Sequence, residues 1–392
     1  MSRFHSYLNT AVSILSRYKG EEPFAAFAKG FFAADKKYGS GDRKMISQLC
    51  YHYFRAIHLF PAEPTEQQII KAHFLCSEQT SPLLEQLEPG WNQSITGSFE
   101  TKWSLLGMDP KHPEIFPFNQ ELSEGIDEKE FGYSHLKQPH LFLRIRPGQH
   151  TTVIQKLTAA GLSFQLISEN CLALPNGSKI ESVLLPDQDV VVQDASSQEA
   201  GELLRLIKKT TRQRIRVWDC CAASGGKSIM SSDILGEQEL VVSDLRESIL
   251  ANLVKRFRVA GMQHYQVMRT DLSAEQFLFN RKFDLIIADV PCSGSGTWGR
   301  TPEQLLYFQK EKIKEYAVLQ KKIVRNAART LQAGGYFLYI TCSVFKQENE
   351  ETLDYLQKEL RLDLVKAQLI KGYHRRSDTM FAALLQKSSE SD

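Results

Sequence analysis

The chain has 392 residues, of which 48 are lysine or arginine and 46 are aspartate or glutamate, so its formal net charge is only +2. Because one compact domain rarely exceeds about 250–300 residues, we expect two or three domains. A hydrophobic content of 42% with 24% charged residues is ordinary for globular proteins and excludes intrinsic disorder as the main feature.

The sequence shows no pattern of export or membrane insertion. No apolar run approaches the roughly 18–20 residues that cross a bilayer. The first residues lead into Arg17 and Lys19 rather than an apolar stretch with a cleavage site, so we expect no signal peptide. Seven thinly spread cysteines, an odd number, then indicate free thiols in a reducing compartment. We expect a cytoplasmic monomer that does not bind membranes.

The near-neutral total conceals an uneven distribution of charge. Residues 1–60 carry a net charge of +5, residues 61–135 carry −9, and residues 136–392 carry +6. Basic flanks permit an anionic partner, but charged residues also cover solvated helix faces, and charge alone favours neither interpretation.

Two regions of different texture come first in the chain. Residues 1–135 show amphipathic helical spacing interrupted by prolines, which predicts an all-helical domain ending in a polar linker over 121–130. Residues 136–198 combine a strand at 141–145, a helix at 153–160 and three further short strands. This pattern predicts a small α+β module.

Residues 199–392 follow a regular alternation of strands and helices. The sequence predicts strands at 215–218, 240–243, 266–268, 283–288 and 335–340, and helices at 227–235, 248–260 and 302–331. Near-continuous apolar strands separated by helices are typical of a parallel sheet covered on both faces. The fold class predicted for this region is therefore α/β.

A glycine-containing loop follows the first of these strands. Residues 219–228 read DCCAASGGKS, and glycine there lets the backbone approach a ligand at a helix N-terminus. A phosphate loop requires glycine at position 221, which is Cys221 here, and the G-x-G-x-x-G fingerprint is missing. We therefore expect a small-molecule site of another kind.

Acidic residues follow successive strands. Asp244 ends the second strand roughly 20 residues after the glycine loop, where a carboxylate suits the hydroxyls of a ribose. Asp271 follows the third strand. One such aspartate is more often a helix cap or turn former, but their succession favours a ligand-binding edge.

Two cysteines also follow strands. Cys292 lies in DVPCSGSG directly after the strand 283–288, and Cys342 lies in TCS directly after the strand 335–340. If these strands are neighbours, both thiols lie at the carboxyl edge where open α/β sheets bind ligands. No C-x-x-C pair occurs, so we expect no structural zinc. Four other cysteines are expected to be small buried hydrophobes: Cys50, Cys76, Cys171 and Cys220.

Taken together, these motifs are similar to those of the RNA cytosine-5 methyltransferases of the Nop/Sun (RsmB/RsmF) family. The resemblance rests on DCCAASGGKS, DVPCSG and TCS followed by Glu348-Asn349-Glu350, with DTMF at 378–381 and QDASSQ at 193–198. It covers about residues 190–385. A weaker similarity at 42–55 is to the NusB-like helical domain of bacterial 16S ribosomal RNA enzymes.

The resemblance implies a Rossmann-like S-adenosylmethionine methyltransferase domain at 199–392, preceded by an RNA-binding helical domain at 1–135 and an RNA-binding module at 136–198. It implies that the methionine end of the cofactor contacts Cys221, Ala222, Ala223, Ser224, Gly225, Gly226 and Lys227. Asp244 would bind the ribose, Asp271 the adenine side, and Asp289 the edge between cofactor and base. Cys342 would be the nucleophile, and Cys292 would release the product.

The implied chemistry requires two thiols. Carbon 5 of cytosine is a poor nucleophile, so reversible addition of a thiolate at carbon 6 must first activate the ring. A hydrogen bond at ring N3, supplied by Asp289, stabilises the adduct. After methyl transfer, the carbon 5 proton is lost and Cys342 is expelled with the help of Cys292. The target base must leave its stack to enter such a site.

The chain departs from the family pattern at three positions. Ser224 stands where proline is usual, Ser228 where threonine is usual, and Arg146 where asparagine is common, which is expected to alter RNA contacts. A basic run is expected to contact the RNA backbone without specificity, and it comprises Arg205, Lys208, Lys209, Arg212, Arg214 and Arg216.

The main hypothesis is S-adenosylmethionine-dependent, metal-free methylation of cytosine carbon 5 in RNA, specifically 16S ribosomal RNA. A tRNA-directed relative would have much the same catalytic domain and stays open. A catalytically idle RNA-binding factor for ribosome assembly is a third possibility, against which the presence of Cys292, Cys342 and Asp289 argues. DNA cytosine-5 methylation is disfavoured, because those enzymes carry the nucleophile in the Pro-Cys motif.

Overall fold

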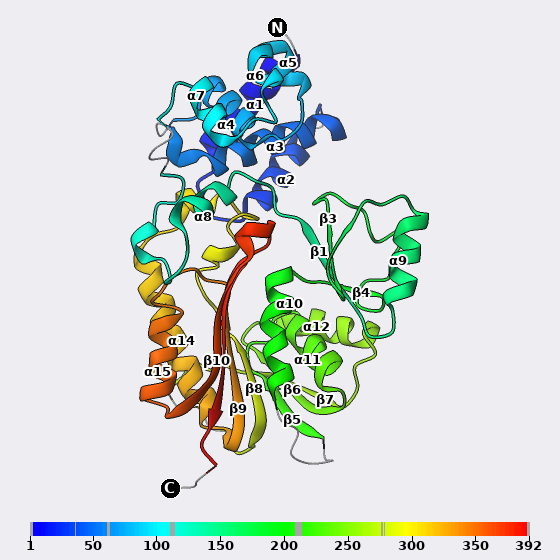
Figure 1. Ribbon diagram of the computed structural model, residues 1–392, viewed down its shortest axis with the longest axis vertical. Helices are drawn as coiled ribbons and strands as arrows, with labels where there is room; N and C mark the ends of the chain where they lie inside the picture. Colours follow the sequence, from blue (N-terminus) through cyan, green and yellow to red (C-terminus); the bar gives the residue numbers. More distant parts are fainter. Residues whose placement is uncertain are drawn as a thin grey trace. The chain divides into compact units, whose positions relative to one another are not determined.

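Two units of structure make up the chain in the computed structural model, which describes residues 3–35, 37–60, 63–109, 114–207, 214–275, 277 and 279–389 (Figure 1). The helical unit spans residues 1–120, 125–138 and 297–309, and the sheet unit spans residues 121–124, 139–296 and 310–392. The segment 297–309 thus groups with the N-terminal helices, although the sequence pattern placed it in the catalytic region. The three-domain division at residues 135 and 198 stays a prediction.

Helices form the described part of the helical unit, as the sequence predicts. They are α1 (Arg3–Arg17), α2 (Phe24–Ala34), α3 (Ser40–Arg55), η1 (Ile57–Leu59), α4 (Glu66–Cys76), α5 (Pro82–Leu87), α6 (Pro89–Gln93), α7 (Phe99–Leu105), α8 (Glu128–Ser134) and α13 (Gln304–Tyr307). In α1 the buried face is Leu8, Ala11, Ile14 and Leu15, which is the spacing of one helix face. The side chains of Thr65 and Gln68 cap the first turn of α4 reciprocally.

The smaller sheet of the sheet unit is antiparallel, with strand order β2-β3-β1-β4. Its elements are β1 (Leu141–Ile145), α9 (His150–Ala159), β2 (Gln165–Ser168), β3 (Cys171–Leu174) and β4 (Val190–Val192). Leu143 of β1 stands opposite Leu172 of β3, and both pack against Leu157 of α9 in one hydrophobic cluster. This arrangement confirms the small α+β module as a structure.

The larger sheet has seven strands in the order β10-β11-β9-β8-β5-β6-β7. The strands are β5 (Ile215–Asp219), β6 (Gln238–Asp244), β7 (Tyr265–Arg269), β8 (Phe283–Asp289), β9 (Leu331–Thr341), β10 (Leu362–Lys371) and β11 (Thr379–Lys387). The run from β9 to β7 is parallel, as predicted. The sequence pattern did not predict that β11 pairs antiparallel with β9 and β10 antiparallel with β11.

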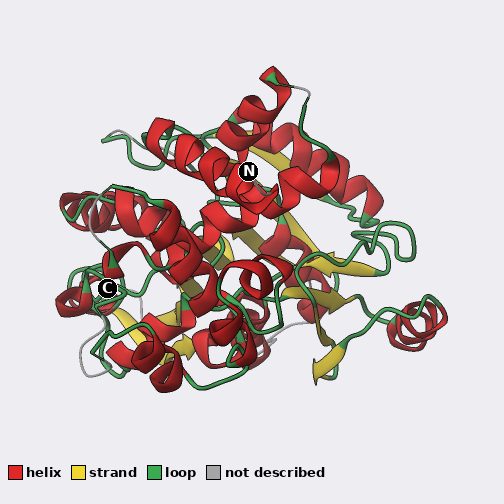
Figure 2. Ribbon diagram, turned by 90° about the horizontal axis from the view of Figure 1, so that it is seen from above, coloured by secondary structure: helices red, strands yellow, loops and turns green. Residues whose placement is uncertain are grey.

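Helices cover both faces of this sheet (Figures 1 and 2). They are α10 (Ala195–Gly201), η3 (Glu202–Leu206), α11 (Gly226–Leu235), α12 (Glu247–Val259), α14 (Glu311–Ala328), α15 (Glu350–Lys358) and η5 (Gly372–Arg375); η2 (Asn119–Glu121) and η4 (Ser295–Thr297) each include residues of both units. Neighbouring strand residues alternate between two cores: Val217 packs with α11 and α12, whereas Trp218 packs with α14. Burial on both faces explains the near-continuous apolar strands.

One predicted helix is divided in the structure. The sequence predicts a single helix over 302–331, but α13 ends at Tyr307, α14 begins at Glu311, and Leu331 begins β9. Leu305 is buried in the helical unit and Ile313 in the sheet unit. Because the two halves pack into different cores, tertiary contacts override the helical propensity of the intervening residues.

Candidate functional site

The predicted site residues gather at the carboxyl edge of the larger sheet. β5, β6 and β8 end at Asp219, Asp244 and Asp289, and β9 ends at Thr341, directly before Cys342. β5 pairs in parallel with β6 and β8, and β8 with β9, so these ends lie along one edge. The structure therefore brings together motifs that are up to about 120 residues apart in the sequence.

The loop after β5 is held in a compact conformation. Ala223 and Gly225 have positive φ values of 45° and 84°, and a Cβ on Gly225 would lie 2.5 Å from Cε1 of Phe257. Arg256 donates hydrogen bonds of 2.9 Å to the backbone oxygen and to Oγ of Ser224. The serine that replaces the usual proline thus has a partner on α12, and glycine is required where the loop approaches that helix.

The buried carboxylate of Asp244 lies beside this loop. The backbone N–H of Ala223 donates to its Oδ2 at 3.1 Å, and Arg246 donates to it from its backbone and guanidinium groups. Burial alone would raise the pKa of Asp244, but the hydrogen bonds from Arg246 and Ala223 outweigh it and lower the pKa. An ionised carboxylate at this place can accept hydrogen bonds from two vicinal hydroxyls.

Asp271 lies two residues beyond β7 and is exposed. Its Oδ1 accepts hydrogen bonds from the backbone N–H of Ser273 at 2.8 Å and from Oγ of Ser273 at 2.6 Å. These bonds lower the pKa of Asp271. The structure thus places Asp271 in a local turn beyond the third strand, and its role at the adenine side stays a prediction.

Lys227 connects the glycine loop to the end of β8. Its Nζ lies 3.1 Å from Oδ2 of Asp289 and donates to Oγ of Ser197 at 2.6 Å. Lys227 is buried, whereas Asp289 is half-buried and accessible. Sequence reasoning did not single out Ser197, although it lies in the QDASSQ segment, because its contact with Lys227 spans 30 residues.

The two strand-end thiols are in contact. Sγ of Cys292 lies 3.2 Å from Sγ of Cys342, and both residues are half-buried. Gly296 packs closely on the backbone beside them: its N–H donates to the Cys342 carbonyl at 2.9 Å, and a Cβ there would lie 1.8 Å from the Thr379 carbonyl oxygen. The hydrogen bond with Cys342 and desolvation raise the pKa of Cys292. The pair is therefore arranged for Cys292 to hold a proton next to Cys342.

Two further carboxylates of this edge were not predicted. Asp219 is fully buried and accepts a 2.6 Å hydrogen bond from Oγ of Ser228, and desolvation raises its pKa to about 7. Glu348 is fully buried beneath the cysteines. The sequence shows Asp219 only as a strand end and Glu348 only as part of a motif, so burial was the missing information.

Arg144 and Arg146 of the smaller sheet reach toward the helices of the larger sheet. Both contact Asp233 of α11, Arg144 through Nη1 at 2.5 Å and Arg146 through Nη2 at 3.0 Å, and Asp233 is largely buried. Arg146 also donates to the carbonyls of Asp187 and Ala260. Both arginines thus connect the smaller sheet to the helices of the larger one, and the expected effect of Arg146 on RNA contacts stays a prediction.

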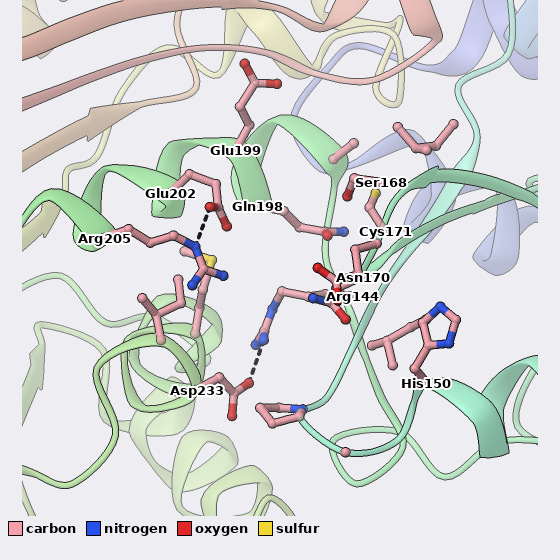
Figure 3. Close-up of a pocket in the computed structure, with 18 of the residues that line it drawn as sticks. Arg144, His150, Ser168, Asn170, Cys171, Gln198, Glu199, Glu202, Arg205 and Asp233 are labelled. Atoms are coloured by element: carbon pink, nitrogen blue, oxygen red, sulfur yellow. Dashed lines mark hydrogen bonds and ion pairs between the residues drawn. The ribbon is translucent and has the colours of Figure 1, made fainter.

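A cavity of about 750 Å³ lies between β1, the β2–β3 hairpin, α10 and α11 (Figure 3). Its three arginines are paired with acidic residues, Arg144 with Asp233, Arg205 with Glu202 and Arg375 with Glu199, and Glu169 adds a further negative charge. Paired charges give no strong field of one sign, which is what a phosphate backbone requires. This cavity is therefore a poor candidate for the main RNA contact.

The basic run is only partly within the described residues. Arg214 pairs with Glu237 at 2.9 Å and Arg216 with Asp284 at 3.2 Å, while Lys208, Lys209 and Arg212 lie outside the described residues.

Among the residues that the structure describes, no group of three or more His, Cys, Asp or Glu side chains is placed to hold a metal ion. The described helices include none with the length and apolar character of a membrane span.

Known proteins are similar to this chain in the region that contains the candidate site. The family model described as 16S rRNA methyltransferase RsmB/F matches residues 206–386. Ribosomal RNA small subunit methyltransferase B of Proteus mirabilis is 28% identical over 261 residues, which are 64% of this chain and 57% of that protein. The chain spans about half the length of the curated relatives it matches.

Solved structures with the same fold cover more of the chain. The crystal structure of PH0851 superposes with a TM-score of 0.67 at 17% identity and covers 98% of both chains. A methyltransferase homologue from Pyrococcus horikoshii has a TM-score of 0.57 at 19% identity and covers 68% of this chain and 92% of its own. These similarities show the fold: a Rossmann-like methyltransferase architecture with a helical N-terminal region.

Proposed function

We propose that this protein methylates carbon 5 of a cytosine in RNA, using S-adenosylmethionine, because residues 206–386 match the family model described as 16S rRNA methyltransferase RsmB/F. The observation that carries the proposal is the contact between Sγ of Cys292 and Sγ of Cys342 at 3.2 Å. The two thiols come from separate motifs and are both half-buried. Thiols that served only packing would not need to meet at an accessible ligand-binding edge.

The residues at this edge fit the cofactor. The close approach of Gly225 to Phe257 leaves no room for a side chain, and the buried Asp244 carboxylate lies beside the loop. The residues proposed to hold the cofactor are Cys221, Ala222, Ala223, Ser224, Gly225, Gly226, Lys227, Asp244, Asp271 and Asp289. When bound, S-adenosylmethionine supplies an electrophilic methyl group.

The protein's own residues activate the base in this proposal. The thiolate of Cys342 adds to carbon 6 of the cytosine, and the ring electrons move toward carbon 5 and N3. As N3 gains electron density it takes up a proton from solvent, and the carboxylate of Asp289, 3.1 Å from Nζ of Lys227, accepts a hydrogen bond from the new N–H and stabilises the adduct. After carbon 5 has accepted the methyl group, its proton passes to solvent water and its electron pair forms the bond between carbons 5 and 6. The bond from carbon 6 to Cys342 breaks, its electron pair returns to the sulfur of Cys342, and the thiol of Cys292 donates a hydrogen bond to that sulfur from 3.2 Å. N3 then returns its proton to solvent.

The substrate is proposed to be 16S ribosomal RNA. The matched relatives are named ribosomal RNA small subunit methyltransferases, which favours this substrate over tRNA. We propose that residues 1–135 and 136–198 contact RNA and that the chain acts as a monomer in the cytoplasm. Basic residues that contact phosphates would make binding fall steeply with salt.

The proposal is tested by incubating the purified protein with S-adenosylmethionine and separate samples of 16S rRNA, small ribosomal subunits and total tRNA. Bisulfite sequencing then locates 5-methylcytosine in each RNA. We expect one methylated cytosine in 16S rRNA, either naked or in the subunit. Methylation of tRNA alone would contradict the substrate, and no methylation of any sample would contradict the activity.

A further inference from the structure

Glu348 lies fully buried between β9 and α15, beneath the two loops that carry the cysteines. A buried carboxylate is costly to desolvate, by several kcal/mol, unless hydrogen bonds replace its water. Desolvation raises the pKa of Glu348 in spite of such bonds. Because burying this carboxylate is energetically unfavourable, its hydrogen-bond partners should explain why it is there.

The carboxylate binds the residue that follows each cysteine. Oγ of Ser343, directly after Cys342, donates to Oε1 of Glu348 at 2.6 Å. The backbone N–H of Ser293, directly after Cys292, donates to Oε2 at 2.9 Å. One side chain thus connects the loop after β8 to the loop after β9.

The carboxylate is itself held by neighbouring elements. Nε2 of Gln320, on α14, donates to Oε2 of Glu348 at 2.8 Å and to the carbonyl of Pro291 at 3.0 Å. The hydroxyl of Tyr339, on β9, donates to the backbone carbonyl of Glu348 at 2.6 Å. These bonds fix Glu348 relative to both strands, so its position sets the separation of the two loops.

We propose that Glu348 is a positioning residue that holds the thiols of Cys292 and Cys342 in contact. This proposal rests on the proposed function, because contact between the thiols is what lets Cys292 assist the release of product from Cys342. Glu348 touches neither sulfur and acts through the residues next to them. Without it, the two loops separate and the thiols lose their mutual orientation.

The separation of the thiols can be measured without RNA or cofactor. Diamide oxidises two adjacent thiols to a disulfide: each sulfur loses a proton, the S–S bond forms, and the two electrons reduce diamide to its hydrazine. The rate of Cys292–Cys342 disulfide formation, followed by mass spectrometry of the linked peptides, reports how well the pair is aligned. A misplacement of about 1 Å can slow such a reaction about a hundredfold.

Three variants test the proposal. Glu348→Ala removes all three acceptor contacts and should slow disulfide formation about 10- to 100-fold. Glu348→Gln keeps an amide oxygen for Ser293 and Gln320 and an N–H for Ser343, so it should retain a rate within about threefold of wild type. Asp354→Ala is the control, because its exposed carboxylate on α15 pairs with Lys358 at 2.7 Å and has no bond to the cysteine loops among the described contacts. It should leave the rate unchanged.

Wild-type disulfide formation in a folded Glu348→Ala variant would overturn the proposal. If that variant fails to fold, as judged by circular dichroism, Ser343→Ala removes only one of the contacts and should still slow the reaction; an unchanged rate there would overturn the proposal equally. Because the assay needs no RNA, its outcome does not depend on methylation. An absence of methylation by the wild-type protein would contradict the proposed function while leaving the positioning role measurable.

Discussion

Each unit of this protein buries a charged side chain that connects distant segments, but the two charges serve different ends. In the helical unit, Arg55 is 2% exposed and donates to the carbonyls of His135 at 2.8 Å and Gly299 at 2.8 Å. In the sheet unit, Glu348 is 0% exposed and accepts from the residues after Cys292 and Cys342. Arg55 satisfies backbone groups, whereas Glu348 orients loops that carry reactive side chains.

The surroundings of the two charges explain the difference. Near Arg55, burial lowers the pKa of His73 and of His135 to about 4, so these imidazoles are neutral at physiological pH. Near Glu348, the thiols of Cys292 and Cys342 remain half-buried and so partly accessible. A buried charge therefore indicates function only when the groups it orients can still reach a ligand.

The largest expected effect concerns the nucleophile. Cys342→Ala should reduce methylation by at least about 10⁴-fold, equivalent to about 5 kcal/mol, because the ring can no longer be activated covalently. Transfer of a labelled methyl group to 16S rRNA measures this loss. Cys50→Ala, at a buried thiol of the helical unit, is the control and should retain most activity in its folded fraction. Full activity of Cys342→Ala would show that this thiol, like Cys50 of the helical unit, is not needed for the reaction.

The next effect concerns stability in the helical unit. Arg55→Met should lower the free energy of unfolding by about 3 kcal/mol, because the carbonyls of His135 and Gly299 lose their donor. Denaturant unfolding measures it, and disulfide formation by Cys292 and Cys342 below the transition should be unchanged. Arg43→Met removes an exposed arginine bonded to the Tyr38 carbonyl and should cost less than about 1 kcal/mol. An equal loss of unfolding free energy in both variants would contradict the claim that burial makes Arg55 more important for stability than Arg43.

A smaller expected effect is the pH dependence of stability that comes from Asp219, at the carboxyl edge of the larger sheet. Desolvation raises the pKa of Asp219 from 3.8 to about 7, so the folded state binds a proton that the unfolded state releases. This contribution to stability is complete below the unfolded pKa and is lost as pH rises through about 7. From pH 5 to pH 7 the wild type should lose about 2 kcal/mol relative to Asp219→Asn.

Unfolding free energies at both pH values measure this difference. Asp363→Asn, which changes an exposed carboxylate on β10, should follow the wild type at both pH values. A stability difference between wild type and Asp219→Asn that stays constant from pH 5 to pH 7 would contradict the account, because it would show that Asp219 is ionised throughout. The pH profile thereby separates a proton-binding buried carboxylate from an ion-paired one.

The sequence predicted which residues lie at the ends of the strands, but it did not predict the side-chain contacts between those ends. Cys292, Cys342 and Asp289 were found because each follows an apolar strand, and parallel pairing brings such ends together. The carboxylate of Glu348 could not be placed, because its donors Ser293 and Gln320 are distant in the sequence and burial is not visible in a motif.

What the sequence did not predict has a common physical cause, which is tertiary packing. The predicted helix over 302–331 is divided because its halves belong to different cores. The internal partners of Arg146, which are Asp233 and two carbonyls of the same unit, were likewise not visible in the sequence. In both cases the residue types were consistent with the local prediction, and contacts with residues distant in the sequence determined where the helix was interrupted and what the arginine contacts.

The central claim is that Cys342 forms the covalent bond to cytosine and Cys292 assists its release. Incubation of Cys292→Ala with labelled RNA and S-adenosylmethionine, followed by a denaturing gel, tests it most directly, with the double variant Cys292→Ala/Cys342→Ala as the control. The account predicts a covalent protein–RNA adduct in the single variant and none in the double variant. Continued turnover by Cys292→Ala without any adduct would contradict it.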